Sequence, residues 1–243
     1  MNNNGKISRI WMSLVGILFC VSVCKADNDF TFETDEITPV EFKTNKIVFD
    51  GIEMPYRVAH INGTGKPSLV IYLHGGSSKG NDNEKQMNEA GIDSITNYLE
   101  SRQIEAIYLV PQCPSDKSWG GPMLGVLKSL IDKYVGDGIV DKNSIYIFGG
   151  SMGGTGTWSM LSAYPGLFTA AMPVAGNPTK VGEYASKTPV FTVMGTEDDL
   201  MDMNTARSFV ENLQEQNVDA RIDIEEGWTH EMTCFESYTT PRL

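Results

Sequence analysis

The chain has 243 residues, 41% of them hydrophobic and 21% charged, so it can bury a substantial core in one large domain or two small ones. Acidic residues outnumber basic ones by 31 to 19, which gives a formal net charge of −12 at pH 7. Such a surface repels nucleic acid and anionic membranes, and no basic run interleaved with aromatic residues offsets it, so a nucleic-acid-binding function is excluded.

The N-terminal residues are predicted to be a targeting segment. Lys6 and Arg9 precede an apolar stretch, residues 10–23, that is short for a membrane span and well sized for the core of a signal peptide. Cleavage after Ala26 would release a soluble protein, whereas lipidation of Cys24 would anchor it, although residues 21–24 place valine where a lipoprotein signal has Gly, Ala or Ser. A retained membrane anchor is the third alternative. We expect a signal peptide over residues 1–26, a single domain over 27–243, and a secreted or periplasmic protein or a cell-envelope lipoprotein.

Two cysteines, Cys113 and Cys234, fall in the expected domain. An oxidising compartment permits a bridge between them, and two separate buried thiols are equally compatible with the sequence.

The first predicted elements form a β-hairpin. Residues 46–51 and 54–59 read as two strands around the turn Asp50-Gly51. His60 ends the second strand, and a histidine at this position is expected to be structural or solvent-facing rather than catalytic.

Strands and helices then alternate along the chain. Apolar runs predict strands over residues 68–73, 104–112, 144–148, 170–175, 190–194 and 221–224. Amphipathic spacing predicts helices over 84–103, with an irregularity near Gly91, over 123–135, after residue 151, and over 202–216. This alternation predicts an α/β domain with a mostly parallel sheet covered on both faces.

The stretch 144–154 carries the motif around which the chain is organised. Its pattern, Gly149-x-Ser151-x-Gly153, is that of a nucleophile elbow, in which glycines permit a turn too tight for neighbouring Cβ atoms. The turn exposes the serine Oγ, and the following helix N-terminus offers N–H groups to developing negative charge. The motif is short enough to arise by chance, so it needs a base and an acid elsewhere in the chain.

Two further strand ends supply them. Asp198 and Asp199 follow the strand 190–194, and His230 follows the last strand on a predicted loop. The carboxyl ends of parallel strands meet at one edge of a sheet, so these side chains can converge on Ser151. The chain has three histidines, and His230 alone comes after the acid, giving the order Ser, Asp, His that an elbow serine requires. Only one of the two adjacent aspartates can face it.

The turn His74-Gly75-Gly76 follows the strand 68–73. Histidine is often a catalytic base, but here we expect it to hydrogen-bond within the loop and leave the following N–H groups free. The backbone N–H groups of Gly76 and Met152 are the predicted oxyanion hole.

These motifs resemble the α/β-hydrolases of the esterase group that includes feruloyl esterases, polyhydroxybutyrate depolymerase-like enzymes and phospholipase/carboxylesterase relatives. The resemblance covers roughly residues 45–240 and is carried by residues 72–76, 80–83, 111–114, Trp119, 141–158 and His230. It departs from the family pattern in the doubled aspartate, in residues 231–234, and in a C-terminus that leaves little room for a final helix.

The resemblance implies the α/β-hydrolase fold with an N-terminal antiparallel hairpin. The family spacing Gly-x-x-Asp after a strand implies Asp198 as the acid, with Asp199 as the alternative and Glu197 more remote. The implied reaction is two-step acyl transfer by Ser151, His230 and Asp198. It requires no metal or organic cofactor, and no Cys/His spacing indicates zinc.

The connection 176–188 is too short to hold a cap domain, so an open site for a small ester, or for an acyl or feruloyl ester on polysaccharide, is expected. Trp228 and Trp119 are candidates for the substrate pocket, whereas Trp158 is expected to pack in the core. A serine peptidase of the prolyl-oligopeptidase type is the alternative enzyme. A catalytically silent glycan- or acyl-binding protein is the alternative from another class.

Overall fold

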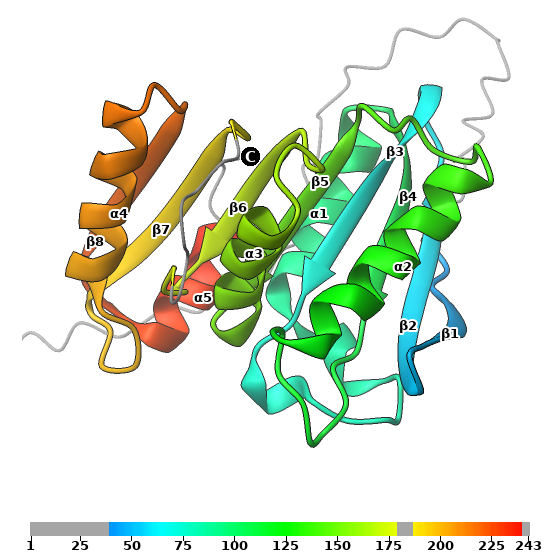
Figure 1. The fold of residues 1–243 in the computed structure, drawn as a ribbon, viewed down its shortest axis with the longest axis horizontal. Coiled ribbons are helices and arrows are strands. Elements are labelled where there is room, and N and C mark those ends of the chain that lie inside the picture. Colours follow the sequence, from blue (N-terminus) through cyan, green and yellow to red (C-terminus); the bar gives the residue numbers. More distant parts are fainter. Residues whose placement is uncertain (1–38, 179–186, 240–243) are drawn as a thin grey trace, which may run out of the picture. The chain divides into compact units, whose positions relative to one another are not determined.

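The core of the fold is one eight-stranded sheet, seen in the computed structural model over the residues that it describes, 39–178 and 187–239 (Figure 1). Its spatial order is β1-β2-β4-β3-β5-β6-β7-β8. The strands are β1 (Lys43–Phe49), β2 (Ile52–Ile61), β3 (Thr64–Leu73), β4 (Ile104–Pro111), β5 (Ile145–Gly150), β6 (Ala170–Val174), β7 (Val190–Glu197) and β8 (Ala220–Thr229). All described residues belong to one unit, Pro39–Leu243. The predicted signal peptide, Cys24 and residues 27–38 lie outside them, so those predictions stay predictions.

The predicted hairpin is confirmed. Strands β1 and β2 pair antiparallel around Asp50 and Gly51, whose φ angles are 49° and 74°. Two successive left-handed residues match the twist of the flanking strands, and the Asp-Gly pair adopts them readily. The hairpin joins the sheet through antiparallel pairing of β2 with β4, and the pairs from β4–β3 to β7–β8 are parallel.

Helices cover both faces of the sheet, as the alternation predicts (Figure 1). One face carries α2 (Pro122–Gly136), α3 (Met152–Ala163) and α4 (Met203–Glu215), and the other carries α1 (Ala90–Ser101) and α5 (His230–Thr239). Each face encloses its own hydrophobic cluster. The apolar run at the end of β3 is buried throughout because the central strands have helices on both sides.

The predicted helix over residues 84–103 is wrong in its first part. Residues Lys85–Asn88 form a short 3₁₀ turn, Glu89 is extended at φ −76° and ψ 128°, and α1 begins at Ala90. The extended residue interrupts the helix at the irregularity that the sequence places near Gly91.

The end of the chain also differs from the prediction. Strand β8 runs to Thr229 instead of ending near residue 224, because β7 extends to Glu197 and pairs with Thr229 past a bulge. His230 is therefore the first residue of α5 and not part of a loop, and a final helix of ten residues is present.

The two cysteines of the domain are free thiols. Burial raises the pKa of both Cys113 and Cys234 to about 12, so each stays protonated near neutral pH. Of the two alternatives left open by the sequence, separate thiols are the one observed.

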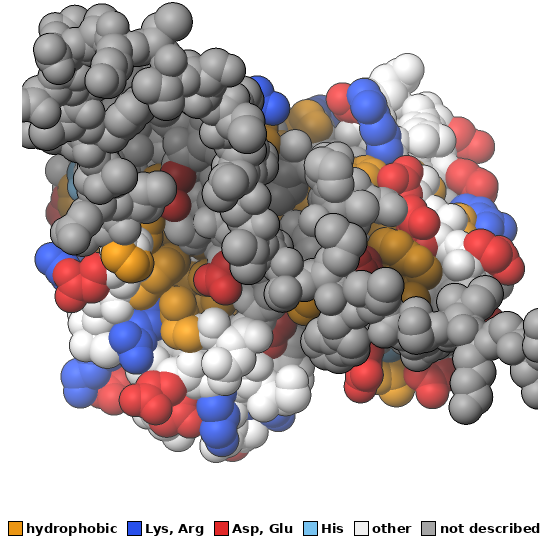
Figure 2. All heavy atoms as spheres, turned by 180° about the vertical axis from the view of Figure 1, so that it is seen from behind, with side chains coloured by type: hydrophobic (Ala, Val, Ile, Leu, Met, Phe, Trp, Pro, Cys, Tyr) orange, Lys and Arg blue, Asp and Glu red, His pale blue; other side chains and the backbone are white. Residues whose placement is uncertain are grey.

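Acidic side chains gather over the β8 end of the sheet, at the right of the reverse view (Figure 2). Within residues 39–178 and 187–239, every helix is too short or too polar to cross a membrane.

Candidate active site

The turn between β5 and α3 holds Ser151 in a strained backbone conformation. Its φ of 58° and ψ of −120° are unusual for a residue with a side chain, and α3 begins at the next residue. The flanking glycines are required by contact, because a Cβ at Gly149 would lie 2.5 Å from the Gly153 carbonyl oxygen, and one at Gly153 would lie 1.8 Å from that of Leu73. The elbow thus packs the start of α3 directly on the ends of β3 and β5.

Three predicted residues meet at this turn. Ser151 Oγ lies 2.7 Å from His230 Nε2, and His230 Nδ1 lies 2.8 Å and 3.0 Å from the two carboxylate oxygens of Asp198. The geometry assigns the imidazole proton to Nδ1, where it is donated to the carboxylate, and leaves Nε2 to accept from the serine hydroxyl. His230 is 8% exposed, and the Asp198 side chain is fully buried.

Of the two adjacent aspartates, Asp198 is the one that contacts the histidine. Its Oδ1 also accepts hydrogen bonds from the N–H groups of Leu200 and Met201, both at 2.9 Å, which fix the carboxylate in place. Asp199 is exposed, and Glu197 is an exposed residue at the end of β7.

His74 lies close by but bonds only to backbone. Its Nε2 accepts from the Cys113 N–H at 2.9 Å, so Nδ1 carries the proton and donates to the Gly75 carbonyl at 2.6 Å. Burial lowers the pKa of His74 to about 4, which keeps the ring neutral. The indole N–H of Trp119 donates to the His74 carbonyl at 3.0 Å. These contacts fit the loop-shaping role expected for His74.

The predicted oxyanion donors lie on two helical starts beside the serine. Gly76 opens a 3₁₀ turn, Gly76–Ser78, and Met152 opens α3. The turn lies against the elbow, since a Cβ at Gly75 would be 3.6 Å from that of Ser151. Of the described residues, none outside these two helical segments accepts from the N–H of Gly76 or Met152.

Sequence reasoning missed Glu89. Its Oε1 accepts from the Gly75 N–H at 3.1 Å and from the Ser78 hydroxyl at 2.7 Å, so one carboxylate oxygen joins both ends of the turn that contains Gly76. The only trace in the sequence is the irregular helical pattern near Gly91. That glycine is required because a Cβ there would lie 2.4 Å from the Tyr72 ring.

Gln112 and Cys234 were also missed. The buried Gln112 amide donates to the Ser78 carbonyl at 3.3 Å and to Asp82 at 2.8 Å, and it accepts from the Asn83 N–H at 2.7 Å. These three hydrogen bonds therefore hold the loop after β3 in place. The Cys234 Sγ lies one helical turn after the proposed base, 4.0 Å from His230 Nε2.

The three tryptophans occupy different surroundings. Trp119 is 2% exposed and borders a groove of about 850 Å³ that Met152 also lines. Trp228 is half-buried and packs against the hydrophobic cluster beneath α1 and α5. Trp158 is fully buried and donates to the Gly176 carbonyl at 3.1 Å, which confirms its core position. Of the two candidates for the substrate pocket, the structure thus places Trp119, and not Trp228, along the groove that Met152 lines.

In the part of the chain that the structure describes, no group of three or more His, Cys, Asp or Glu side chains is arranged to hold a metal ion. Residues 179–186 of the connection between β6 and β7 lie outside that part, so the prediction of an uncapped site stays a prediction.

Solved structures share this fold. A thermostable esterase is 28% identical, with a TM-score of 0.72 over 82% of this chain and 60% of its own length. A feruloyl esterase module from Clostridium thermocellum, solved as a mutant in complex with sinapinate, is 14% identical, with a TM-score of 0.64 over 82% of this chain and 86% of its own. An acylaminoacyl peptidase from Pyrococcus horikoshii is 13% identical, with a TM-score of 0.62 over 84% of this chain and 40% of its own.

These likenesses confirm the α/β-hydrolase fold that the resemblance implies. The chain spans only 60% and 40% of the length of the thermostable esterase and the peptidase. No curated protein matches the chain.

The model of one protein family matches residues 117–238, a segment that contains Ser151, Asp198 and His230. Since this match covers half of the sequence, the chain belongs to the dienelactone hydrolase family.

Proposed function

We propose that the chain is a serine hydrolase that cleaves carboxylic esters by acyl transfer. The observation that carries this proposal is the unbroken relay from Ser151 Oγ to His230 Nε2 at 2.7 Å and from His230 Nδ1 to Asp198 Oδ2 at 2.8 Å. A serine hydroxyl is a weak nucleophile by itself, and such a relay is the usual means of activating it.

In the proposed reaction, His230 Nε2 removes the proton of Ser151 as Oγ attacks the ester carbonyl carbon. The Nδ1–H bond to Asp198 holds the tautomer and stabilises the imidazolium. His230 then returns the proton to the departing alkoxide, which leaves as the alcohol. Water, deprotonated by the same nitrogen, hydrolyses the acyl-enzyme and frees Ser151.

The negative charge that develops on the carbonyl oxygen is assigned to the N–H groups of Gly76 and Met152. Support comes from their positions at two helical starts beside the serine. The Glu89 carboxylate and the His74 ring would hold the first of these donors in place through the Gly75 backbone.

The substrate class is proposed from the resemblance and the family together. Small esters, or acyl and feruloyl esters carried on polysaccharide, fit the uncapped site that the short connection 176–188 predicts. A secreted or periplasmic location, with a lipid anchor at Cys24 as one variant, would bring the enzyme to such substrates.

A serine peptidase is the second candidate. The acylaminoacyl peptidase and a puromycin-hydrolysing peptidase from Mycobacterium tuberculosis share the fold, at 13% and 16% identity. This chain covers only 40% and 38% of their lengths. A catalytically silent binder is disfavoured because a binding protein has no use for a strained serine already paired with a histidine.

Labelling with a fluorophosphonate probe tests the serine-hydrolase class directly. The expected result is a single adduct on Ser151 in the folded protein and none in Ser151→Ala, with Ser159→Ala, which lies on the same helix, labelled like the parent. Absence of an adduct on folded protein would overturn the proposal.

Paired substrates then separate esterase from peptidase. The 4-nitrophenyl ester of an acyl group and the 4-nitroanilide of the same group differ only in the scissile bond. We expect turnover of the ester to exceed that of the anilide by several orders of magnitude. Faster cleavage of the anilide would select the peptidase.

A further inference from the structure

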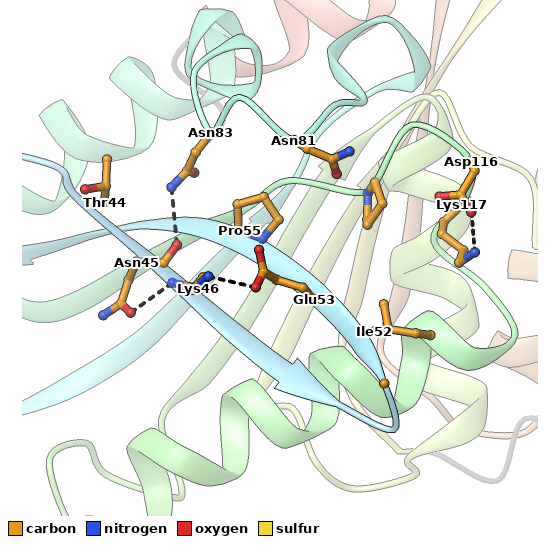
Figure 3. A pocket seen from close by; sticks show the side chains of 12 residues that line it. Thr44, Asn45, Lys46, Ile52, Glu53, Pro55, Asn81, Asn83, Asp116 and Lys117 are labelled. Atoms are coloured by element: carbon orange, nitrogen blue, oxygen red, sulfur yellow. Dashed lines mark hydrogen bonds and ion pairs between the residues drawn. The ribbon is translucent and has the colours of Figure 1, made fainter.

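A polar groove of about 740 Å³ lies beside the β1–β2 hairpin, away from the catalytic relay (Figure 3). The hairpin forms one side of it, and the loops that follow β3 and β4 form the other. Its lining includes Thr44, Asn45, Pro55, Asn81 and Pro114 together with two pairs of charged side chains.

The walls of this groove are held in place by Asn83. Its side-chain nitrogen donates to the backbone carbonyls of Asn45 at 3.3 Å and Tyr56 at 3.1 Å, which ties the loop after β3 to both strands of the hairpin. Asn83 is 9% exposed, and its left-handed φ of 57° suits an asparagine. Because these bonds are already made, the groove is formed before a ligand arrives.

Other polar groups point into the groove without a partner among the described residues. The exposed Asn81 amide makes no hydrogen bond among those residues. The Thr44 hydroxyl is exposed as well. Amides and hydroxyls that donate and accept at once are the groups that recognise hydroxyl-rich ligands.

The charges in the groove cancel. Lys46 Nζ lies 2.8 Å from Glu53 Oε2, and Lys117 is paired with Asp116. An anionic ligand would have to displace a carboxylate from its lysine, and a cationic ligand would have to displace a lysine from its carboxylate. An uncharged ligand binds with no such loss. The Pro55 and Pro114 rings give the groove flat apolar surfaces on which the C–H face of a sugar ring can rest.

The groove shares two lining residues with a second groove that lies nearer the proposed nucleophile. Asp116 and Lys117 line it, and they also line the groove of about 850 Å³ that Trp119 and Met152 border. Met152 is the residue directly after Ser151. A ligand chain can therefore extend from the elbow, over the loop after β4, to the hairpin.

We infer that the hairpin groove is a binding subsite for the alcohol portion of the ester, and that this portion is an uncharged saccharide. The inference rests on the proposed function, because the ester carbonyl must lie at Ser151 while the sugar chain reaches the groove. It commits the enzyme to esters whose alcohol is an oligosaccharide rather than a short alkanol.

Two substrates that share the feruloyl group and differ in their alcohol test this subsite: methyl ferulate and the feruloyl ester of xylotriose. Wild-type protein is expected to turn over the sugar ester with a KM about tenfold lower. In the double variant Thr44→Ala/Asn81→Ala this advantage should disappear, while methyl ferulate turnover stays within twofold. Each lost neutral hydrogen bond corresponds to roughly a fivefold change in affinity, so the loss of two bonds, about 25-fold in all, is enough to remove a tenfold advantage.

Asn62→Ala is the matched control, because Asn62 is also exposed but lies between β2 and β3, at the opposite edge of the sheet. It should leave both substrates unchanged. Equal KM values for the two esters in wild-type protein, or equal losses on both in the double variant, would overturn the subsite.

A binding measurement separates this inference from the proposed function. Free xylotriose is titrated into wild-type protein, Ser151→Ala and the double variant, with binding followed by calorimetry. Binding that survives in Ser151→Ala and is lost in the double variant supports the subsite even if no ester is cleaved, in which case the proposed function alone fails. No binding to any of the three, alongside normal ester turnover, overturns the subsite and leaves the proposed function standing.

Discussion

Glu89 holds the turn that carries the proposed oxyanion donor through one carboxylate oxygen. That oxygen accepts from the Gly75 N–H and the Ser78 hydroxyl, the two ends of the turn that presents Gly76. Hydrogen bonds to an ionised carboxylate are about twice as strong as neutral ones, so the turn is held firmly without any contact between Glu89 and substrate. Glu89 is in this sense a positioning residue.

Glu89→Gln is expected to lower kcat for ester hydrolysis about tenfold and to leave KM within twofold. Loss of a whole oxyanion donor costs roughly 10²–10³ in kcat, and a looser donor should cost less. The kcat and KM values for a 4-nitrophenyl ester measure this split. Glu100→Gln, at the exposed far end of α1, should match wild type. A fall in activity that follows a fall in melting temperature would show a structural role instead.

His74 links the same turn to pH. Burial lowers its pKa to about 4, against an ordinary value of 6.5. Below pH 6.5 the unfolded chain therefore takes up a proton that the folded chain refuses. The stabilisation from His74 is complete above pH 6.5 and is lost as the pH falls toward 4, by about 3 kcal/mol in all.

His74→Gln removes this titration while keeping a side-chain acceptor near the position of Nε2. We expect the variant to be less stable than wild type at pH 7, with the difference shrinking steadily as the pH falls to 4.5. Urea unfolding at half-unit steps between pH 7 and 4.5 measures it. A constant difference across this range would show that His74 titrates alike in the folded and unfolded chain.

At the scale of elements, the strands were predictable apart from the end of β8, whereas the start of α1 and the whole of α5 were not. Runs such as residues 68–73 are apolar on both faces, and only a strand between two helical layers buries them all. Residues 84–89 carry a helical pattern as well, but Glu89 gains two hydrogen bonds to the turn after β3 by staying extended. A contact between residues far apart in sequence decides that boundary, so local periodicity cannot show it.

The helix after the elbow illustrates how closely two elements approach. A Cβ at Gly156 would lie 2.3 Å from the Cβ of Trp119, whose indole N–H holds the His74 carbonyl. Neither atom is at the free end of a flexible side chain, so α3 or the loop after β4 must move to admit a methyl group.

Gly156→Ala should therefore lower the free energy of unfolding by about 2–3 kcal/mol, despite the better helix propensity of alanine. Gly136→Ala, at the end of α2, is the control, because a Cβ there meets nothing within 4 Å. It should be neutral or stabilising by up to about 1 kcal/mol. Equal melting temperatures for the two variants would contradict the close packing of α3 on Trp119.

For the whole molecule, chain order was enough to propose Ser151, His230 and one of two adjacent aspartates, and the family resemblance then favoured Asp198 over Asp199. Parallel strands bring their carboxyl ends to one edge of the sheet, whatever loops connect them. Ser151, Asp198 and His230 follow β5, β7 and β8, which lie within four consecutive strands of the sheet. The hairpin groove could not be predicted from the sequence. Its lining comes from the hairpin and from loops after two other strands, and single asparagines in such loops carry no pattern that sequence can reveal.

The charge of the whole chain bears on which esters reach the site. The formal net charge is −12, and exposed acidic residues, Glu197, Asp199 and Glu231, lie beside Asp198 and His230 in the sequence. A field of this sign repels anionic substrates over about 30 Å at 10 mM salt but only about 8 Å at 150 mM.

Two esters of matched length test this repulsion: 4-nitrophenyl butyrate, which is neutral, and 4-nitrophenyl hemisuccinate, which is anionic. Between 10 and 200 mM sodium chloride, kcat/KM for the hemisuccinate should rise several-fold as the field is screened, whereas that for the butyrate should stay within twofold. Replacing Glu197 and Asp199 by Gln and Asn should raise the low-salt value for the hemisuccinate alone. A hemisuccinate rate that falls with salt would mean that a local cation outweighs the net charge at the site.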